Sequence, residues 1–185
     1  MSESSLGAFY DGGFTEGVVG WAFPPVNHDR LNPLAKYTYF YNVPTAEQVV
    51  LRNTPVEYIQ KSHIASFDVS YDLARFWTLG GKYAYRLGQV SLEREDPEFF
   101  DNNAHLVILR GDYRFLKDWE SSLELRMLDL PDLQDRRSGF VFSVYRYVGD
   151  HFKVGVGYNF TDFSDDLTDL GYDHRGVFLN IVGTL

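Results

Sequence analysis

The sequence predicts an all-β protein, an antiparallel up-and-down transmembrane β-barrel of ten strands, within a range of eight to twelve. Three observations predict it. Apolar and polar residues alternate with a period of two along most of the chain, as in strands with one buried face. The connections between these runs are short and long in turn, as in outer-membrane barrels. The last run, 177–185, stays apolar on one face to its final residue, as expected of a strand that seals a closed barrel.

The N-terminal part of the chain supplies the first strands. A weak strand is expected at 6–10, and Asp11-Gly12-Gly13 is a turn signal. The next strand, 14–23, ends at Pro24-Pro25 because proline cannot donate to a sheet ladder. After a turn at 27–33, the strand 35–42 alternates Tyr37, Tyr39 and Tyr41 against Lys36, Thr38 and Phe40. These patterns predict a strand, a hairpin turn and two further strands before the first long loop, at 43–56.

The rest of the chain alternates in the same way. Short turns are expected at Ala74-Arg75, Lys117-Asp118 and Gly149-Asp150, and long loops at 93–103, 131–137 and 161–173. Such an asymmetry is typical of barrels with short periplasmic turns and longer extracellular loops. The strands expected between these connections are 57–73, 76–92, 104–115, 119–130, 139–148, 152–160 and 177–185.

Length and composition narrow the class of protein. The 185 residues form one domain, 1–185, and the absence of cysteine excludes a disulfide framework and a thiolate metal site. A formal charge of −9 argues against nucleic-acid binding. No apolar stretch approaches the roughly 20 residues that a transmembrane helix needs. Strands whose two faces cancel in the average hydropathy are the remaining way to cross a membrane.

Sorting each strand by face separates charged from apolar residues. The charged face is predicted to line a lumen, and its members are Glu16, Lys36, Asp68, Asp72, Lys82, Arg86, Arg110, Asp112, Arg114, Glu120, Glu124, Arg126, Arg146 and Lys153. The apolar face is predicted to face lipid, and its members are Trp21, Tyr37, Tyr39, Phe67, Val69, Tyr71, Tyr83, Tyr85, Leu109, Tyr113, Leu123, Leu125, Tyr145, Val154, Val156, Tyr158, Leu179 and Ile181.

The number of aromatic residues decides which face points outward. The sequence contains 13 Tyr and 15 Phe, which the narrow interior of a ten-stranded barrel cannot hold. Lipid on the outside removes that limit, and Tyr and Trp near strand ends suit the two interfacial girdles. A β-sandwich with one wet face is the alternative fold, but strands of 15 to 17 residues are long for a sandwich.

Several segments resemble a known family. The run from Gly155 to Gly176, GVGYNFTDFSDDLTDLGYDHRG, resembles the closing segment of the C-terminal outer-membrane β-barrel domain of large bacterial (Gram-negative) envelope proteins. The segments 27–32, 35–39 and 79–88 resemble the same domain. The resemblance implies a membrane barrel but no particular activity. The polar start of the chain shows no secretory leader, so an excised or engineered segment is expected.

Candidate sites other than the lumen are few. The acidic loops, with Asp162, Asp165, Asp166, Asp169 and Asp173 in the last of them, lack the spacing and glycine of an EF-hand, so solvated loops are expected. The histidines at 28, 63, 105, 151 and 174 stand singly, which argues against a metal site. Ser62 and His63 are adjacent on one strand and therefore point to opposite faces, so they cannot act as nucleophile and base. No catalytic residue and no cofactor is predicted.

The predicted function is that of an integral, porin-like barrel of the bacterial outer membrane. It acts as a membrane anchor or as a small passive pore, it is a monomer, and its partners are the lipid bilayer or detergent and ions in the lumen. The lumenal charges allow two interpretations, an ion-selecting lining or an interior network of ion pairs that blocks conduction. The competing class is a soluble, lipocalin-like barrel that binds a small apolar ligand.

Overall fold

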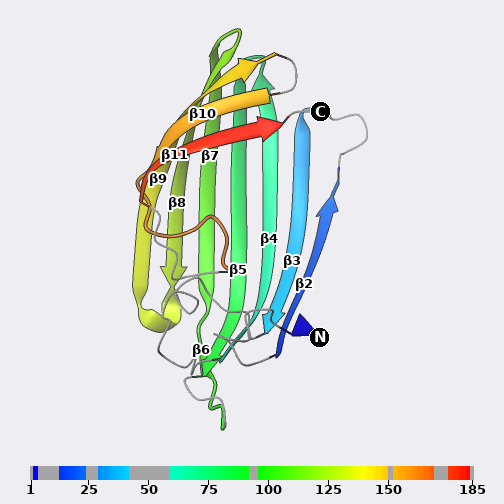
Figure 1. Cartoon of the computed structure of the whole chain (residues 1–185), viewed down its shortest axis with the longest axis vertical. Coiled ribbons are helices and arrows are strands. Elements are labelled where there is room, and N and C mark those ends of the chain that lie inside the picture. Colours follow the sequence, from blue (N-terminus) through cyan, green and yellow to red (C-terminus); the bar gives the residue numbers. More distant parts are fainter. Residues whose placement is uncertain are drawn as a thin grey trace.

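The structure, a computed structural model, describes residues 2–3, 13–23, 29–41, 59–91, 96–149, 152–168 and 175–183. In this part of the chain nearly all regular structure is β-strand. Figure 1 shows the strands side by side in a sheet that curls, so that β10 and β11 turn across the strands from the middle of the chain. The strands are β1 (Ser2–Glu3), β2 (Gly13–Ala22), β3 (Leu31–Tyr41), β4 (Ile59–Ala74), β5 (Trp77–Ser91), β6 (Phe100–Asp101), β7 (Ala104–Leu116), β8 (Trp119–Leu130), β9 (Asp135–Val148), β10 (Phe152–Asn159) and β11 (Gly176–Gly183).

The topology is that of an antiparallel meander. The sheet has eleven strands in the order β1-β2-β3-β4-β5-β7-β8-β9-β10-β11, with the two-residue β6 paired to β5 beside this path. All pairs are antiparallel. The predicted all-β, up-and-down architecture is confirmed. Within the described residues no ladder joins β11 to β1 or β2.

The predicted strand bounds agree with the structure to within a few residues, with four exceptions. The two-residue β1 was not predicted, and β9 begins at Asp135, inside the segment 131–137 that was predicted to be a loop. The strand β3 begins at Leu31, inside the segment 27–33 that was predicted to be a turn, and β6 lies in the predicted loop 93–103. Pro33 sits within β3 without breaking it, because it lies at the end of the β2 ladder, where its main-chain oxygen accepts a hydrogen bond from the Phe23 N–H at 3.1 Å, while the pairing with β4 continues at Val69. The weak strand expected at 6–10 lies outside the described residues.

The two ends of the sheet have different connections. At one end, here called the turn end, β4 and β5 are joined by Arg75 and Phe76, and β7 and β8 by Lys117 and Asp118. At the other, the loop end, the longer connections lie, including the one from β10 to β11. The only helical segment in the described residues is a single 3-10 turn, Pro131–Leu133, at the loop end.

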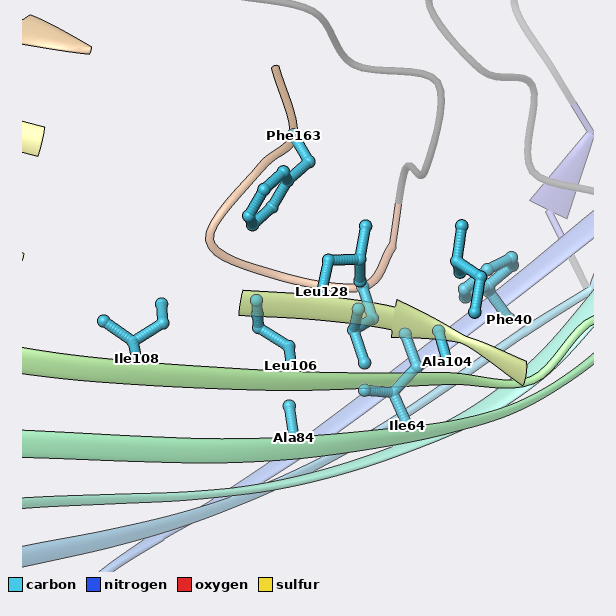
Figure 2. Close-up of a cluster of buried hydrophobic side chains, with 10 residues drawn as sticks. Phe40, Ile64, Ala84, Ala104, Leu106, Ile108, Leu128 and Phe163 are labelled. Atoms are coloured by element: carbon cyan, nitrogen blue, oxygen red, sulfur yellow. The ribbon is translucent and has the colours of Figure 1, made fainter. Parts of the chain in front are cut away.

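A small apolar core lies at the loop end, on the concave side of the sheet. This inner face carries Leu106 and Leu128, which are almost fully buried, and Phe163 of the β10–β11 connection lies above them (Figure 2). The complete cluster is Phe40, Ile64, Ala84, Ala104, Leu106, Ile108, Leu128, Leu130, Phe163 and Leu167. Because the sheet is one layer thick, this cluster exists only where a connecting segment covers the inner face.

The outer face is apolar and exposed. Leu109, Leu125 and Val156 each leave half or more of their surface uncovered, at 58%, 54% and 50%. The described residues contain no helix long and apolar enough to cross a membrane.

Candidate pore lining

The inner face gathers most of the charged residues that were predicted to line a lumen. Cross-strand register defines it, since partners in a ladder point to the same side. Asp68 pairs with Lys82, Arg110 with Glu124, and Lys36 with Ser66, on the side where the apolar core lies. All of the predicted charged set except Arg114 and Arg146 is on this face by the same criterion, and Arg114 is placed there by its contacts with Glu120 and Tyr147.

Two neighbouring residues of β9 are exchanged relative to the prediction. Tyr145 was predicted to face lipid, but it pairs with Gly155 and Glu120 and lies on the inner face. Arg146 was predicted to line the lumen, but it pairs with Trp119 on the outer face and its guanidinium lies 5.6 Å from the centre of that indole ring. Both assignments were wrong because β9 is apolar on both faces, so alternation gave no register there.

Glu120 is the centre of an ion-pair network on the turn half of the inner face. Its carboxylate accepts hydrogen bonds from Lys153 at 2.6 Å and from the Tyr147 hydroxyl at 2.7 Å, and Arg114 lies 3.9 Å away. Arg114 in turn donates to the Tyr147 hydroxyl at 3.0 Å. The Glu120 side chain is only 12% exposed, so this network replaces water around a largely buried charge.

A water-accessible cavity of about 370 Å³ opens beside this network at the turn end. Its polar lining has both signs of charge, so it offers no single-sign binding surface. The lining residues are Arg30, Asp72, Ala74, Arg75, Phe76, Thr78, Asp112, Arg114 and Glu120. A second space of about 70 Å³ lies further in, beside Asp68, Lys82 and Glu124.

Two further ion pairs on the inner face each join residues of one strand. Arg126 lies 2.6 Å from Glu124, and Arg110 lies 3.1 Å from Asp112. Residues two apart on a strand point to the same face, so these short pairs follow directly from the alternation of the sequence. Asp68 has no ion-pair partner among the described residues.

At the loop end, the first part of the β10–β11 connection folds back onto the inner face. We call residues 161–168 the inserted segment. Thr161, Phe163 and Leu167 are 0%, 2% and 1% exposed, and the two apolar side chains complete the core cluster. Gly139 makes the fit possible, because a Cβ atom there would lie 2.7 Å from the Thr161 Cγ2 atom.

Two cationic side chains of β5 hold the inserted segment. The Lys82 ammonium donates to the main-chain oxygen of Asp165 at 2.6 Å. The Arg86 guanidinium, 1% exposed, donates to the main-chain oxygen of Leu167 at 3.0 Å and lies 5.4 Å from the Phe40 ring centre. Main-chain oxygens that would be unpaired in an apolar cluster are satisfied in this way.

Asp166 stiffens the inserted segment from within. Its carboxylate accepts hydrogen bonds from the hydroxyl and the backbone N–H of Thr168. Burial alone would raise the pKa of Asp166, but these hydrogen bonds and the charges of Lys36 and Lys82 outweigh it and hold the pKa below its usual range. The segment is therefore anionic at neutral pH.

Within residues 161–168, Asp162 and Asp165 are exposed, as expected of a solvated acidic loop, but Asp166 is half-buried and the segment as a whole packs on the inner face. Phe163 and Leu167, two apolar residues spaced four apart within an acidic run, were the signal that this stretch packs against something. Asp169 and Asp173 lie outside the described residues. The apolar core at the loop end was not predicted either. Its residues Leu106, Ile108 and Leu128 have apolar neighbours in the sequence, so alternation does not assign them to the inner face.

The predicted lipid-facing residues, Tyr145 excepted, all lie on the outer face by register. Aromatic pairs flank the apolar surface. Toward the turn end, Trp77 and Tyr113 stack with ring centres 4.4 Å apart. Toward the loop end, the Tyr83 hydroxyl lies 2.9 Å from Nδ1 of His105, which stacks on Tyr85 at 4.6 Å.

The same arrangement recurs two strands away, where His63 stacks on Tyr39 at 4.9 Å and its Nδ1 lies 2.6 Å from the Tyr37 hydroxyl. The two described histidines are therefore partners of tyrosines. In the described part of the chain, no three His, Cys, Asp or Glu side chains gather as metal ligands would.

A solved structure with a similar fold is described as "NanC porin structure in rhombohedral crystal form". It matches with a TM-score of 0.52 and 10% sequence identity, over 93% of this chain and 94% of that chain. This chain has the porin-like β-barrel fold. The likeness extends over nearly the whole of both chains, so it concerns the architecture and not a local motif. No known family profile and no curated protein matches the sequence.

Proposed function

We propose that this protein is an integral barrel of the bacterial outer membrane, with the outer face in lipid and the inner face around a narrow, partly water-filled lumen. The observation that carries the proposal is the inverted distribution of polarity. Leu109 and Leu125 face outward and are more than half exposed, whereas the neighbouring Arg110, Glu124 and Arg126 face inward and form ion pairs. A soluble, lipocalin-like carrier would need the opposite arrangement.

The height of the apolar surface supports the same proposal. On β5 the aromatic pairs begin at Trp77 and at Tyr85, eight residues apart, which is about 26 Å along a strand. At the usual tilt of about 40° this corresponds to about 20 Å of membrane, close to the roughly 25 Å band of outer-membrane barrels. Between them on this face lie Leu79, Gly81 and Tyr83.

The lumen is proposed to act as a small passive pore at most. The inserted segment fills the loop end, and the space beside Asp68 and Lys82 holds about 70 Å³. Ion pairs line the wider turn end. A barrel with such an interior also suits a membrane anchor, including the terminal domain of a larger envelope protein. The similar structure is that of a porin, which favours the pore.

The first experiment tests membrane insertion. We expect the protein to fold only in detergent or lipid, and to migrate faster on an unheated gel than after boiling. Leu109→Arg places a charge in the middle of the outer surface and should make the free energy of membrane insertion less favourable by about 2–4 kcal/mol.

Arg110→Leu, the adjacent inward position, is the matched control, and it should insert like the unchanged protein. A water-soluble monomer that folds without detergent, or equal insertion of the Leu109→Arg variant, would contradict the proposal.

A further inference from the structure

The inserted segment, residues 161–168, differs in charge from the part of the inner face that it covers, which we call the wall. It contains Asp162, Asp165 and Asp166 and no basic residue. The wall presents Lys82 and Arg86, which bind its main chain, and Lys36, whose charge acts on Asp166. An anionic segment therefore lies on a cationic strip within an otherwise balanced interior.

The segment keeps its shape through bonds between its own residues and Asn159. Thr161 binds the Asn159 side chain through its backbone N–H at 2.9 Å, and the Thr161 hydroxyl donates to the Phe163 oxygen at 3.1 Å. The turn around Asp166 is closed by Ser164 and Thr168. Asn159 is the last residue of β10, so the Thr161 end is tied to the wall, whereas the turn around Asp166 is closed by the segment's own residues and can leave the wall as a unit.

The contacts with the wall are few in kind. They consist of Thr161 against Gly139, of two apolar side chains, Phe163 and Leu167, and of the bonds that Lys82 and Arg86 make to main-chain oxygens. Below Leu167 a crevice of about 10 Å³ remains, lined in part by Ile64, Ala84 and Ser66. The Thr161 end of the segment is therefore fitted closely against β9, whereas the part from Phe163 to Leu167 is held by two apolar side chains and two hydrogen bonds.

We propose that the inserted segment is a displaceable, negatively charged plug, held in the barrel by Lys82 and Arg86, and that its departure opens the pore. This inference rests on the proposed membrane pore and adds the element that controls it. Because three carboxylates move with the plug, a transmembrane voltage acts on it directly, and one polarity favours the open state.

A reversible tether gives the decisive test, since the chain has no cysteine of its own. Ala84→Cys with Leu167→Cys would join the wall to the plug across the crevice that both line. The control, Ser66→Cys with Ala84→Cys, joins two directly paired wall positions and leaves the plug free. The conductance of both proteins is recorded in planar bilayers bathed in potassium chloride solution, first with the cysteines oxidised and then after a reductant is added.

We expect openings of the wall-to-plug pair to be rare when oxidised and to rise several-fold on reduction, while the wall-to-wall pair is insensitive to the reductant. Asp165→Asn with Asp166→Asn should make the opening less steeply dependent on voltage. Equal conductance of the tethered and reduced forms, or failure of the two cysteines to react with one another, would overturn the plug.

The failure of this inference is distinguishable from failure of the proposed function. Heat-modifiable migration and detergent-dependent folding report on the membrane barrel alone. A protein that passes both and yet shows no reductant-dependent conductance in the wall-to-plug pair is a membrane barrel without a displaceable plug.

Discussion

The loop end and the turn end of the inner face differ although they belong to the same strands. On β7, Leu106 and Ile108 are 0% and 6% exposed, whereas the Arg110 and Asp112 side chains, further along the same face, are 38% and 18% exposed. The first pair lies in the cluster that the inserted segment completes, whereas Asp112 lines the turn-end cavity and Arg110 the smaller space further in. The comparison shows that the inner face carries buried, apolar side chains only where another segment covers it, and charged, hydrated side chains where it is open.

The largest expected effect separates the two ends directly. Leu106→Ala removes a fully buried side chain and should lower the free energy of unfolding by about 2–5 kcal/mol, since it leaves a cavity under Phe163. Arg110→Ala, four residues away on the same face, should cost no more than about 1 kcal/mol, because its ion pair is partly exposed. Urea unfolding of both variants in detergent measures the difference, and equal losses would remove the distinction between the two ends.

A smaller effect is expected at the ion-pair network of the turn end. Glu120→Gln keeps the size of the side chain but weakens its bonds to Lys153 and Tyr147, and should cost about 1–2 kcal/mol. A double-mutant cycle with Lys153→Met isolates the pair. Arg136→Ala is the control, since its partner Asp129 lies on the exposed outer face and the loss should stay below about 1 kcal/mol. A coupling energy of zero between positions 120 and 153 would show that the network contributes nothing.

The smallest effect concerns pH and the inserted segment. The pKa of Asp166 is lower in the folded protein than in the unfolded chain, so its contribution to stability is present above the usual carboxylate pKa of about 3.9. That contribution is lost as the pH falls through the lower, folded pKa. We expect the difference in Tm between the unchanged protein and Asp166→Asn to be present at pH 6 and to vanish in acid. A difference that is constant with pH would contradict this assignment.

The strands and most of the faces could be predicted from the sequence, because alternation is strong where charges lie opposite tyrosines, as along β4 and β5. It failed on β9, where Val141, Phe142, Val144 and Tyr145 give no polar face and a shift of one residue changes nothing in the pattern. The inserted segment could not be placed, because its position depends on contacts with strands distant in the sequence. The Lys82 and Arg86 bonds to its main chain leave no trace in residue spacing.

One contact on the inner wall bears on the width of the lumen. Tyr145 points inward, and a Cβ atom at Gly155 would lie 2.2 Å from its Cδ1 atom, so the phenol ring rests flat on bare backbone. Lys153 extends over the same ring, 4.5 Å from its centre. The Tyr145 ring therefore projects only a short distance into the lumen, although it is on the inner face. A methyl group at position 155 would tip the ring upright and narrow the passage without altering a single charge.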